Sequence, residues 1–84
     1  MSERVTGTFA ATGQSATITA NRLAIDLNFG TGTVVVQWRL DGENWTDVES
    51  FTADAAKIYG PGPTVEWRLN CTVYSADIVY SMVN

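Results

Sequence analysis

The chain has 84 residues, of which 45% are hydrophobic and 17% are charged, and its five basic and nine acidic residues leave a net charge of −4. This length predicts one domain with a thin hydrophobic core. The scattered basic residues argue against nucleic-acid binding, and no apolar run approaches the roughly 20 residues that a membrane-spanning helix needs.

The first half of the chain alternates between apolar and polar residues with a period of two, which is the pattern of half-buried β-strands. Strands are predicted at residues 4–9, 14–20, 23–29 and 33–40. An amphipathic helix at 23–29 is disfavoured because Leu23, Ile25 and Leu27 are spaced by two. Since residues 30–32 are too few for a parallel crossover, we expect 23–29 and 33–40 to pair antiparallel.

A hairpin is predicted at the centre of the chain. Asp41-Gly42 follows the strand at 33–40, and this dipeptide is a strong hairpin signal between apolar-periodic runs. Short strands are predicted at 44–48 and 50–52. The following residues, 53–57, are the one segment compatible with a helical turn.

The last third of the chain begins with a brief strand at 58–59 and a firm break at Gly60-Pro61-Gly62-Pro63. Strands are predicted at 64–72 and 78–83, with a turn at 74–77. The strand at 78–83 is apolar on both faces, so we expect it to be central in a sheet or part of an interface.

About six to eight short strands with turn signals between them predict an all-β protein, a small antiparallel β-sandwich or jelly roll. We expect residues 1–84 to form a single domain, with residues 1–5 as a flexible arm. The predicted core is Leu23, Ile25, Leu27, Val34, Val36, Trp38, Leu40, Trp45, Val65, Trp67, Leu69, Cys71, Ile78 and Tyr80.

The residues offer little chemistry for catalysis. The chain contains no histidine and a single cysteine, Cys71, which shares the inner phase of its strand and is expected to be an inert core thiol. We therefore predict no enzyme activity, no catalytic residue, no cofactor and no internal disulfide. Asp41, Glu43, Asn44 and Asp47 are oxygen donors, but their spacing does not match a calcium loop, so no metal site is predicted.

The aromatic and charged residues have simpler interpretations. Trp38, Trp45 and Trp67 could form a sugar-stacking platform, but Trp38 and Trp67 share the phase of the aliphatic core. Tyr59, beside the proline loop, is the better candidate for an exposed contact. Cross-strand ion pairs are expected for Asp26 with Arg39 and for Glu66 with Arg68.

Three segments, taken together, resemble small virion-associated structural proteins of tailed bacteriophages. They are VTGTFAATGQSATIT at 5–19, VVQWRLDGENWTDV at 35–48 and VEWRLNCTVYSADIVYSMV at 65–83. The family tends to carry T-G-T-F-T-A-T-G-Q-S, V-x-L-x-R-S-x-D-G-G-x-x-W and Y-R-L-x-C-T-x-Y-x-S-G in this order. The departures at Leu40, Glu43 and Ala76 lie at predicted turns.

The resemblance implies a non-enzymatic virion protein, and the leading hypothesis is a capsid decoration (cement) protein that stabilises the mature shell. Its partners would be the major capsid protein and further copies of itself, as a homotrimer or another symmetric oligomer. It would be made in the bacterial host cytoplasm, without a signal peptide, and would lie on the virion surface. The predicted interface residues are Val5, Tyr59, Pro61 and Pro63.

Two alternatives remain open at this point. The first is a low-copy component of the tail, the fibre base or the head–tail joint. The second belongs to another class, a glycan- or host-binding module that uses the tryptophans.

Overall fold

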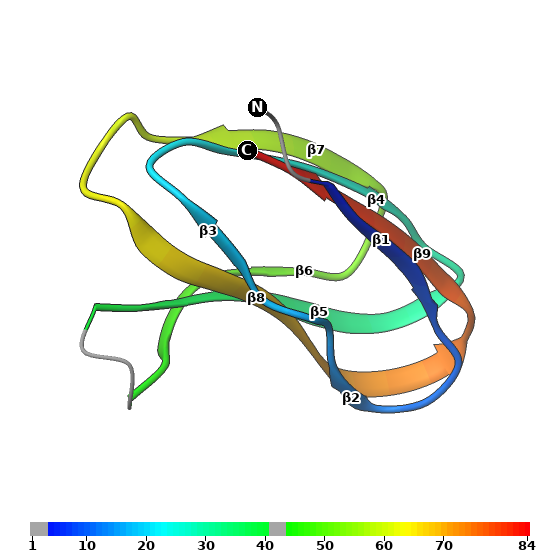
Figure 1. Ribbon diagram of the computed structural model, residues 1–84. Coiled ribbons are helices and arrows are strands. Elements are labelled where there is room, and N and C mark those ends of the chain that lie inside the picture. The colour runs from blue at the N-terminus through cyan, green and yellow to red at the C-terminus, as the bar shows by residue number, and fades with distance from the viewer. Residues whose placement is uncertain (1–3, 41–43) are drawn as a thin grey trace.

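The computed structural model describes residues 4–40 and 44–84, which form nine β-strands and no helix. The strands make two antiparallel sheets that pack face to face (Figure 1). This confirms the predicted all-β antiparallel sandwich, with more strands than the expected six to eight.

The first sheet, called the β4 sheet below, has the order β1-β9-β4-β7. Its strands are β1 (Arg4–Phe9), β9 (Ile78–Val83), β4 (Leu23–Asn28) and β7 (Ala55–Tyr59). The second, the β5 sheet, has the order β2-β8-β5-β6, and β3 also pairs with β8. Its strands are β2 (Gly13–Gln14), β8 (Val65–Ala76), β5 (Thr31–Arg39), β6 (Thr46–Phe51) and β3 (Ile18–Ala20).

Several predicted strands are confirmed closely. β1 and β9 have the predicted bounds, and β9 is central, between β1 and β4. β5 and β6 pair antiparallel as the predicted hairpin requires, although its Asp41-Gly42 turn lies outside the described residues. The segment 14–20 is divided into β2 and β3 at Ser15, because the N–H of Leu69 donates to the Ser15 hydroxyl at 2.9 Å instead of to a strand carbonyl.

Two local predictions are wrong. Residues 53–57 form no helical turn: the strand β7 begins at Ala55 and pairs with β4. So short a segment gains little from helical hydrogen bonds, whereas pairing with β4 satisfies its backbone groups. The predicted turn at 74–77 is also absent, because β8 continues to Ala76 and only Asp77 separates it from β9.

The predicted pairing of residues 23–29 with 33–40 is wrong as well. β4 and β5 lie in different sheets, and the chain crosses from one sheet to the other at Gly30. The Gly30 N–H donates to the carbonyl of Asp77, at 2.8 Å, where β8 crosses to β9. Both strands bear one apolar face, and folding over a common core buries both faces, which a flat hairpin would not achieve.

The core fills the space between the sheets. It consists of Phe9, Ile18, Ala20, Leu23, Ile25, Leu27, Val34, Val36, Val65, Trp67, Leu69, Cys71, Ile78 and Met82. Trp38 and Tyr80 were predicted in the core and are partly buried against it. The prediction that Leu40 belongs to the core is wrong, because Leu40 lies beyond the last paired residue of β5 and is 71% exposed.

Gly32 provides a test of the crossing. A Cβ atom at this residue would lie 2.2 Å from the carbonyl oxygen of Val73 and φ is 153°, so Gly32→Ala should lower the free energy of unfolding by about 2 kcal/mol. Gly62→Ala is the matched control, because nothing lies within 4 Å of its added Cβ. Urea unfolding measures both, and equal midpoints for the two variants would contradict the steric argument.

Candidate functional site

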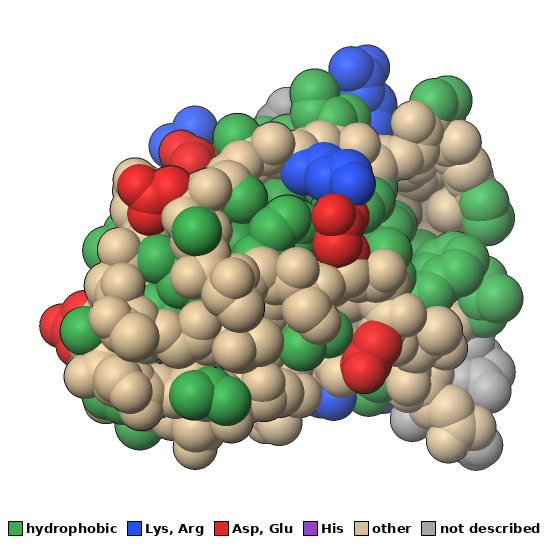
Figure 2. All heavy atoms as spheres, turned by 180° about the vertical axis from the view of Figure 1, so that it is seen from behind, with side chains coloured by type: hydrophobic (Ala, Val, Ile, Leu, Met, Phe, Trp, Pro, Cys, Tyr) green, Lys and Arg blue, Asp and Glu red, His purple; other side chains and the backbone are tan. Residues whose placement is uncertain are grey.

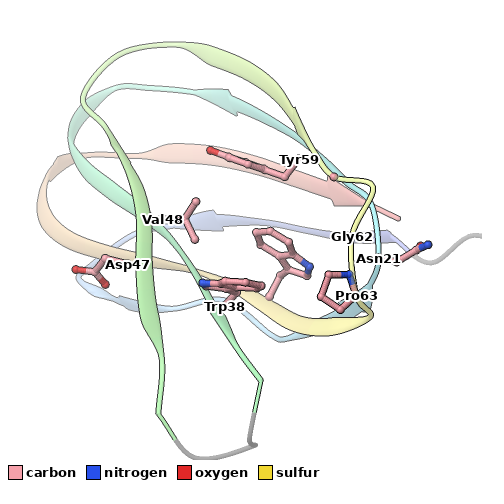
Figure 3. Close-up of a pocket in the computed structure, with 9 residues that line it drawn as sticks. Asn21, Trp38, Asp47, Val48, Tyr59, Gly62 and Pro63 are labelled. Atoms are coloured by element: carbon pink, nitrogen blue, oxygen red, sulfur yellow. The ribbon is translucent and has the colours of Figure 1, made fainter.

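The end of the sandwich opposite Gly30 carries a pocket of about 380 Å³ (Figure 3). Each of four strands contributes an apolar wall residue: Trp38 from β5, Val48 from β6, Tyr59 from β7 and Trp67 from β8. The remaining lining residues are Asn21, Asp47, Gly60, Gly62 and Pro63. The pocket is therefore built jointly by both sheets and by the proline loop.

Three aromatic rings form a continuous cluster in this pocket. The ring centroids of Tyr59 and Trp67 lie 5.5 Å apart in a stacked arrangement, and those of Trp38 and Trp67 lie 5.8 Å apart. Trp67 is 7% exposed, and its indole N–H donates to the carbonyl of Ala20 at 3.1 Å. Trp67 is thus a fixed floor, and the more accessible Trp38 and Tyr59 are its neighbours.

A β-bulge places Val48 in the wall. Val36 pairs with Glu49 and Gln37 pairs with Asp47, which leaves Val48 without a partner in the ladder. A bulge of this kind re-aims side chains. Figure 3 shows the Val48 side chain on the pocket side of its strand and the Asp47 carboxylate directed away from the rings.

The proline loop is held against the turn between β3 and β4. The N–H of Gly62 donates to the carbonyl of Asn21 at 3.0 Å. Gly60 has φ of 102°, and a Cβ there would lie 2.6 Å from the same carbonyl oxygen, so a glycine is needed at this close approach. The peptide bond between Gly60 and Pro61 is cis. These contacts position Pro63 as the outer wall.

An ion pair bridges the edges of the two sheets beside the pocket. Glu49 of β6 accepts hydrogen bonds from Lys57 Nζ at 2.5 Å and from the Tyr59 hydroxyl at 2.9 Å, and both residues belong to β7. These two bonds lower the pKa of Glu49, with Lys57 the larger cause. Burial, followed by the bond to Glu49, raises the pKa of Tyr59.

The outer face of the β5 sheet carries a separate polar network. Arg39 pairs with Glu66 through two hydrogen bonds of 3.1 Å, so the expected pairs of Arg39 with Asp26 and of Glu66 with Arg68 are wrong. Asp26 lies in the other sheet, and Arg68 instead donates to Gln37 at 2.7 Å.

Trp45 belongs to this outer network and not to the predicted core. The guanidinium carbons of Arg39 and Arg68 lie 4.6 Å and 4.2 Å from its ring centroid. The amide of Gln37 donates to Asp47 at 2.7 Å, which engages one oxygen of that carboxylate. Trp45 is therefore separated from the other two tryptophans by the β5 sheet.

The structure brings three of the four predicted interface residues together. Tyr59 and Pro63 line the pocket, and Pro61 is exposed in the same loop. Val5 lies in β1 at the opposite edge of the β4 sheet, paired with Met82 and partly buried against the core. Because Val5 is the second residue of β1, the predicted N-terminal arm does not extend to it.

Sequence reasoning missed Val48 and the role of Trp38 and Trp67 as pocket walls. The inward phase of the two tryptophans was recognised correctly. The two tryptophans lie at the end of the core, where one ring remains accessible. This position depends on which strand ends meet, and the alternation of apolar and polar residues along a strand does not predict it. The bulge that re-aims Val48 has no local signal in the sequence.

Other candidate groups form no site in the part of the chain that the structure describes. Cys71 is buried, and burial raises the pKa of its thiol. Residues 4–40 and 44–84 contain no cluster of three potential metal ligands, and Asp41 and Glu43 of the calcium hypothesis lie outside them. No helix within these ranges is long and apolar enough to cross a membrane.

Comparison with known proteins adds no relative. No protein-family model, no curated protein and no solved structure matches the chain.

The bridge at Glu49 predicts a pH dependence. A carboxyl whose pKa is lowered by folding stabilises the fold above its ordinary pKa, near 4.3, and this contribution disappears as pH falls through the lowered value. Glu49→Gln should therefore lower the melting temperature at pH 7 and have a smaller effect at pH 3. Thermal unfolding by circular dichroism checks this, and Lys57→Gln should reproduce part of the loss at pH 7. The same loss for Glu49→Gln at both pH values would refute the lowered pKa.

Proposed function

We propose that this chain is a non-enzymatic structural protein of a tailed-bacteriophage virion, a decoration protein that binds and stabilises the mature capsid. The observation that carries the proposal is the open apolar pocket at the Tyr59 end, next to an exposed proline loop. Contiguous apolar surface left open on a small domain marks a contact with another protein, a membrane or a ligand.

Further exposed apolar side chains support a contact surface. Leu40 is 71% exposed, Ile58 is 57% exposed, and Val48 at the pocket wall is 40% exposed. Figure 2 shows hydrophobic side chains distributed among polar ones on the far side of the molecule, with a basic and an acidic side chain side by side among them.

The sequence resemblance supports the same assignment. Its three segments fall on β1 and β2, on the adjoining parts of β5 and β6, and on β8 and β9. β1 pairs with β9, and β2 and β5 pair with β8, so the resembling segments are neighbours in the two sheets. The likeness therefore involves the framework of the fold and not one isolated turn.

The proposed mechanism is additive. Each copy would contact the major capsid protein through the pocket and the proline loop, and symmetric oligomers would engage several capsid subunits at once. Linked weak contacts raise the overall affinity far above that of one contact. Repetition over the shell would then brace it against the pressure of packaged DNA.

The number of copies in purified particles tests the proposal. Quantitative mass spectrometry should give a simple ratio of this chain to the major capsid protein. A handful of copies per particle would instead assign it to the tail or neck, and absence from the particle would overturn both virion assignments.

A pocket variant tests the proposed surface. Tyr59→Ala should weaken binding to undecorated capsids at least about tenfold, because it removes an aromatic wall at the centre of the contact. Tyr74→Ala is the matched control: Tyr74 is also partly buried, but it lies at the other end of β8 and donates to Asp77 at 2.5 Å. Cosedimentation measures both variants after circular dichroism confirms their fold. Equal binding by the two would remove the pocket from the interface.

A further inference from the structure

We propose that the aromatic pocket recognises a proline-containing extended segment of a partner protein. Only the origin of that segment, the capsid shell, rests on the proposed function. Recognition itself follows from the walls and the hydrogen-bonding groups of the pocket.

The pocket walls favour a compact apolar ring. Trp38, Tyr59 and Trp67 present aromatic surfaces, and Pro63 and Val48 close two sides. The volume of about 380 Å³ is at the small end for ligand sites, which suits one or two side chains. A proline ring fills such a space with little loss of conformational entropy, since its backbone is already restricted.

The hydrogen-bonding groups of the pocket restrict the chemical class of the ligand further. The indole N–H of Trp67 is engaged by Ala20, and the Tyr59 hydroxyl is engaged by Glu49. The indole N–H of Trp38 makes no hydrogen bond to any residue that the structure describes. Figure 3 shows this nitrogen at the end of the ring toward β6 and away from Pro63, so the pocket offers an uncommitted side-chain donor on its β6 side.

Side-chain acceptors, by contrast, are directed away from the aromatic cluster. Figure 3 shows the Asn21 side chain and the Asp47 carboxylate pointing outward, and the Tyr59 hydroxyl at the end of its ring away from Pro63. A ligand that accepts a hydrogen bond without donating one fits this arrangement best. The peptide group before a proline has a carbonyl oxygen and no N–H, so it meets this condition.

The same set of side-chain donors and acceptors disfavours a sugar as the ligand. A pyranose could stack on the tryptophans, but each of its hydroxyls carries a proton that needs an acceptor. Aromatic grooves that bind extended proline-rich segments use a combination of ring surfaces and preformed ligand geometry, as this pocket would.

The test uses the whole chain labelled with ¹⁵N and an acetylated, amidated decaproline peptide as the probe. The three tryptophans give three indole N–H signals, which Trp→Phe variants assign. We expect decaproline to shift the Trp38 signal in a saturable manner and to leave that of Trp45, on the outer face, unchanged. A glycine–serine peptide of equal length should shift neither.

Trp38→Phe retains a ring but removes the donor, so it should weaken decaproline binding about tenfold, the value of one well-made hydrogen bond. Trp45→Phe is the matched control and should bind as the parent chain does. The titration of the parent chain decides the matter even where Trp38→Phe fails to fold.

Three results would overturn the inference. Decaproline could leave the Trp38 signal unmoved at millimolar concentration. Maltohexaose could shift that signal where decaproline does not, which would make the pocket a glycan site. The signal could also move on dilution without any ligand, which would show that a second copy fills the pocket. Binding of decaproline with no copies in the virion would instead leave this inference intact and remove the proposed function.

Discussion

Two of the crossings between the sheets are paired by a backbone hydrogen bond at the Gly30 end, and the rest of the structure depends on this pair. β4 leads to β5 through Gly30, β8 leads to β9 through Asp77, and the Gly30 N–H donates to the Asp77 carbonyl at 2.8 Å. Each crossing joins strands of opposite sheets, so the apolar faces of consecutive strands meet across the core. The absence of a side chain at Gly32, beside the carbonyl of Val73, permits this close approach.

At the opposite end, the crossings from β3 to β4 and from β7 to β8 are also joined by a backbone hydrogen bond, from the Gly62 N–H to the Asn21 carbonyl at 3.0 Å. The second of these crossings is the longer proline loop, residues 60–64, and the candidate site lies beside it. Trp38 is six residues along β5 from Gly32, a distance of about 20 Å at the usual rise of a strand. Side chains also hold this end together: the tryptophan cluster inside, and Glu49 with Lys57 and Tyr59 at the sheet edges. Aromatic rings pack the end of the core incompletely, and an apolar pocket remains.

A pocket at one end of a well-connected sandwich would suit the proposed binding role. The crossings at both ends and the buried strands fix the framework, so the pocket walls are preformed and a partner would not need to order them. The outer network around Trp45 performs a different task, because its two arginines and Glu66 fasten the β5–β6 side to β8. Replacing Trp45 therefore probes the scaffold, whereas replacing Trp38 probes the pocket.

The sequence by itself determined the fold class, most of the strands and most of the core, because period-two alternation is a local consequence of burying one face of a strand. β1 and β9 have the predicted bounds, and Leu23, Ile25 and Leu27 face inward as expected. Only the tertiary structure decided that β4 and β5 belong to different sheets, because a short loop after a strand serves either a hairpin or a crossing. Tertiary structure also decided that Tyr59, Pro63 and Trp38 share one pocket while Val5 lies apart: sequence alternation defines faces, but strand order defines neighbours.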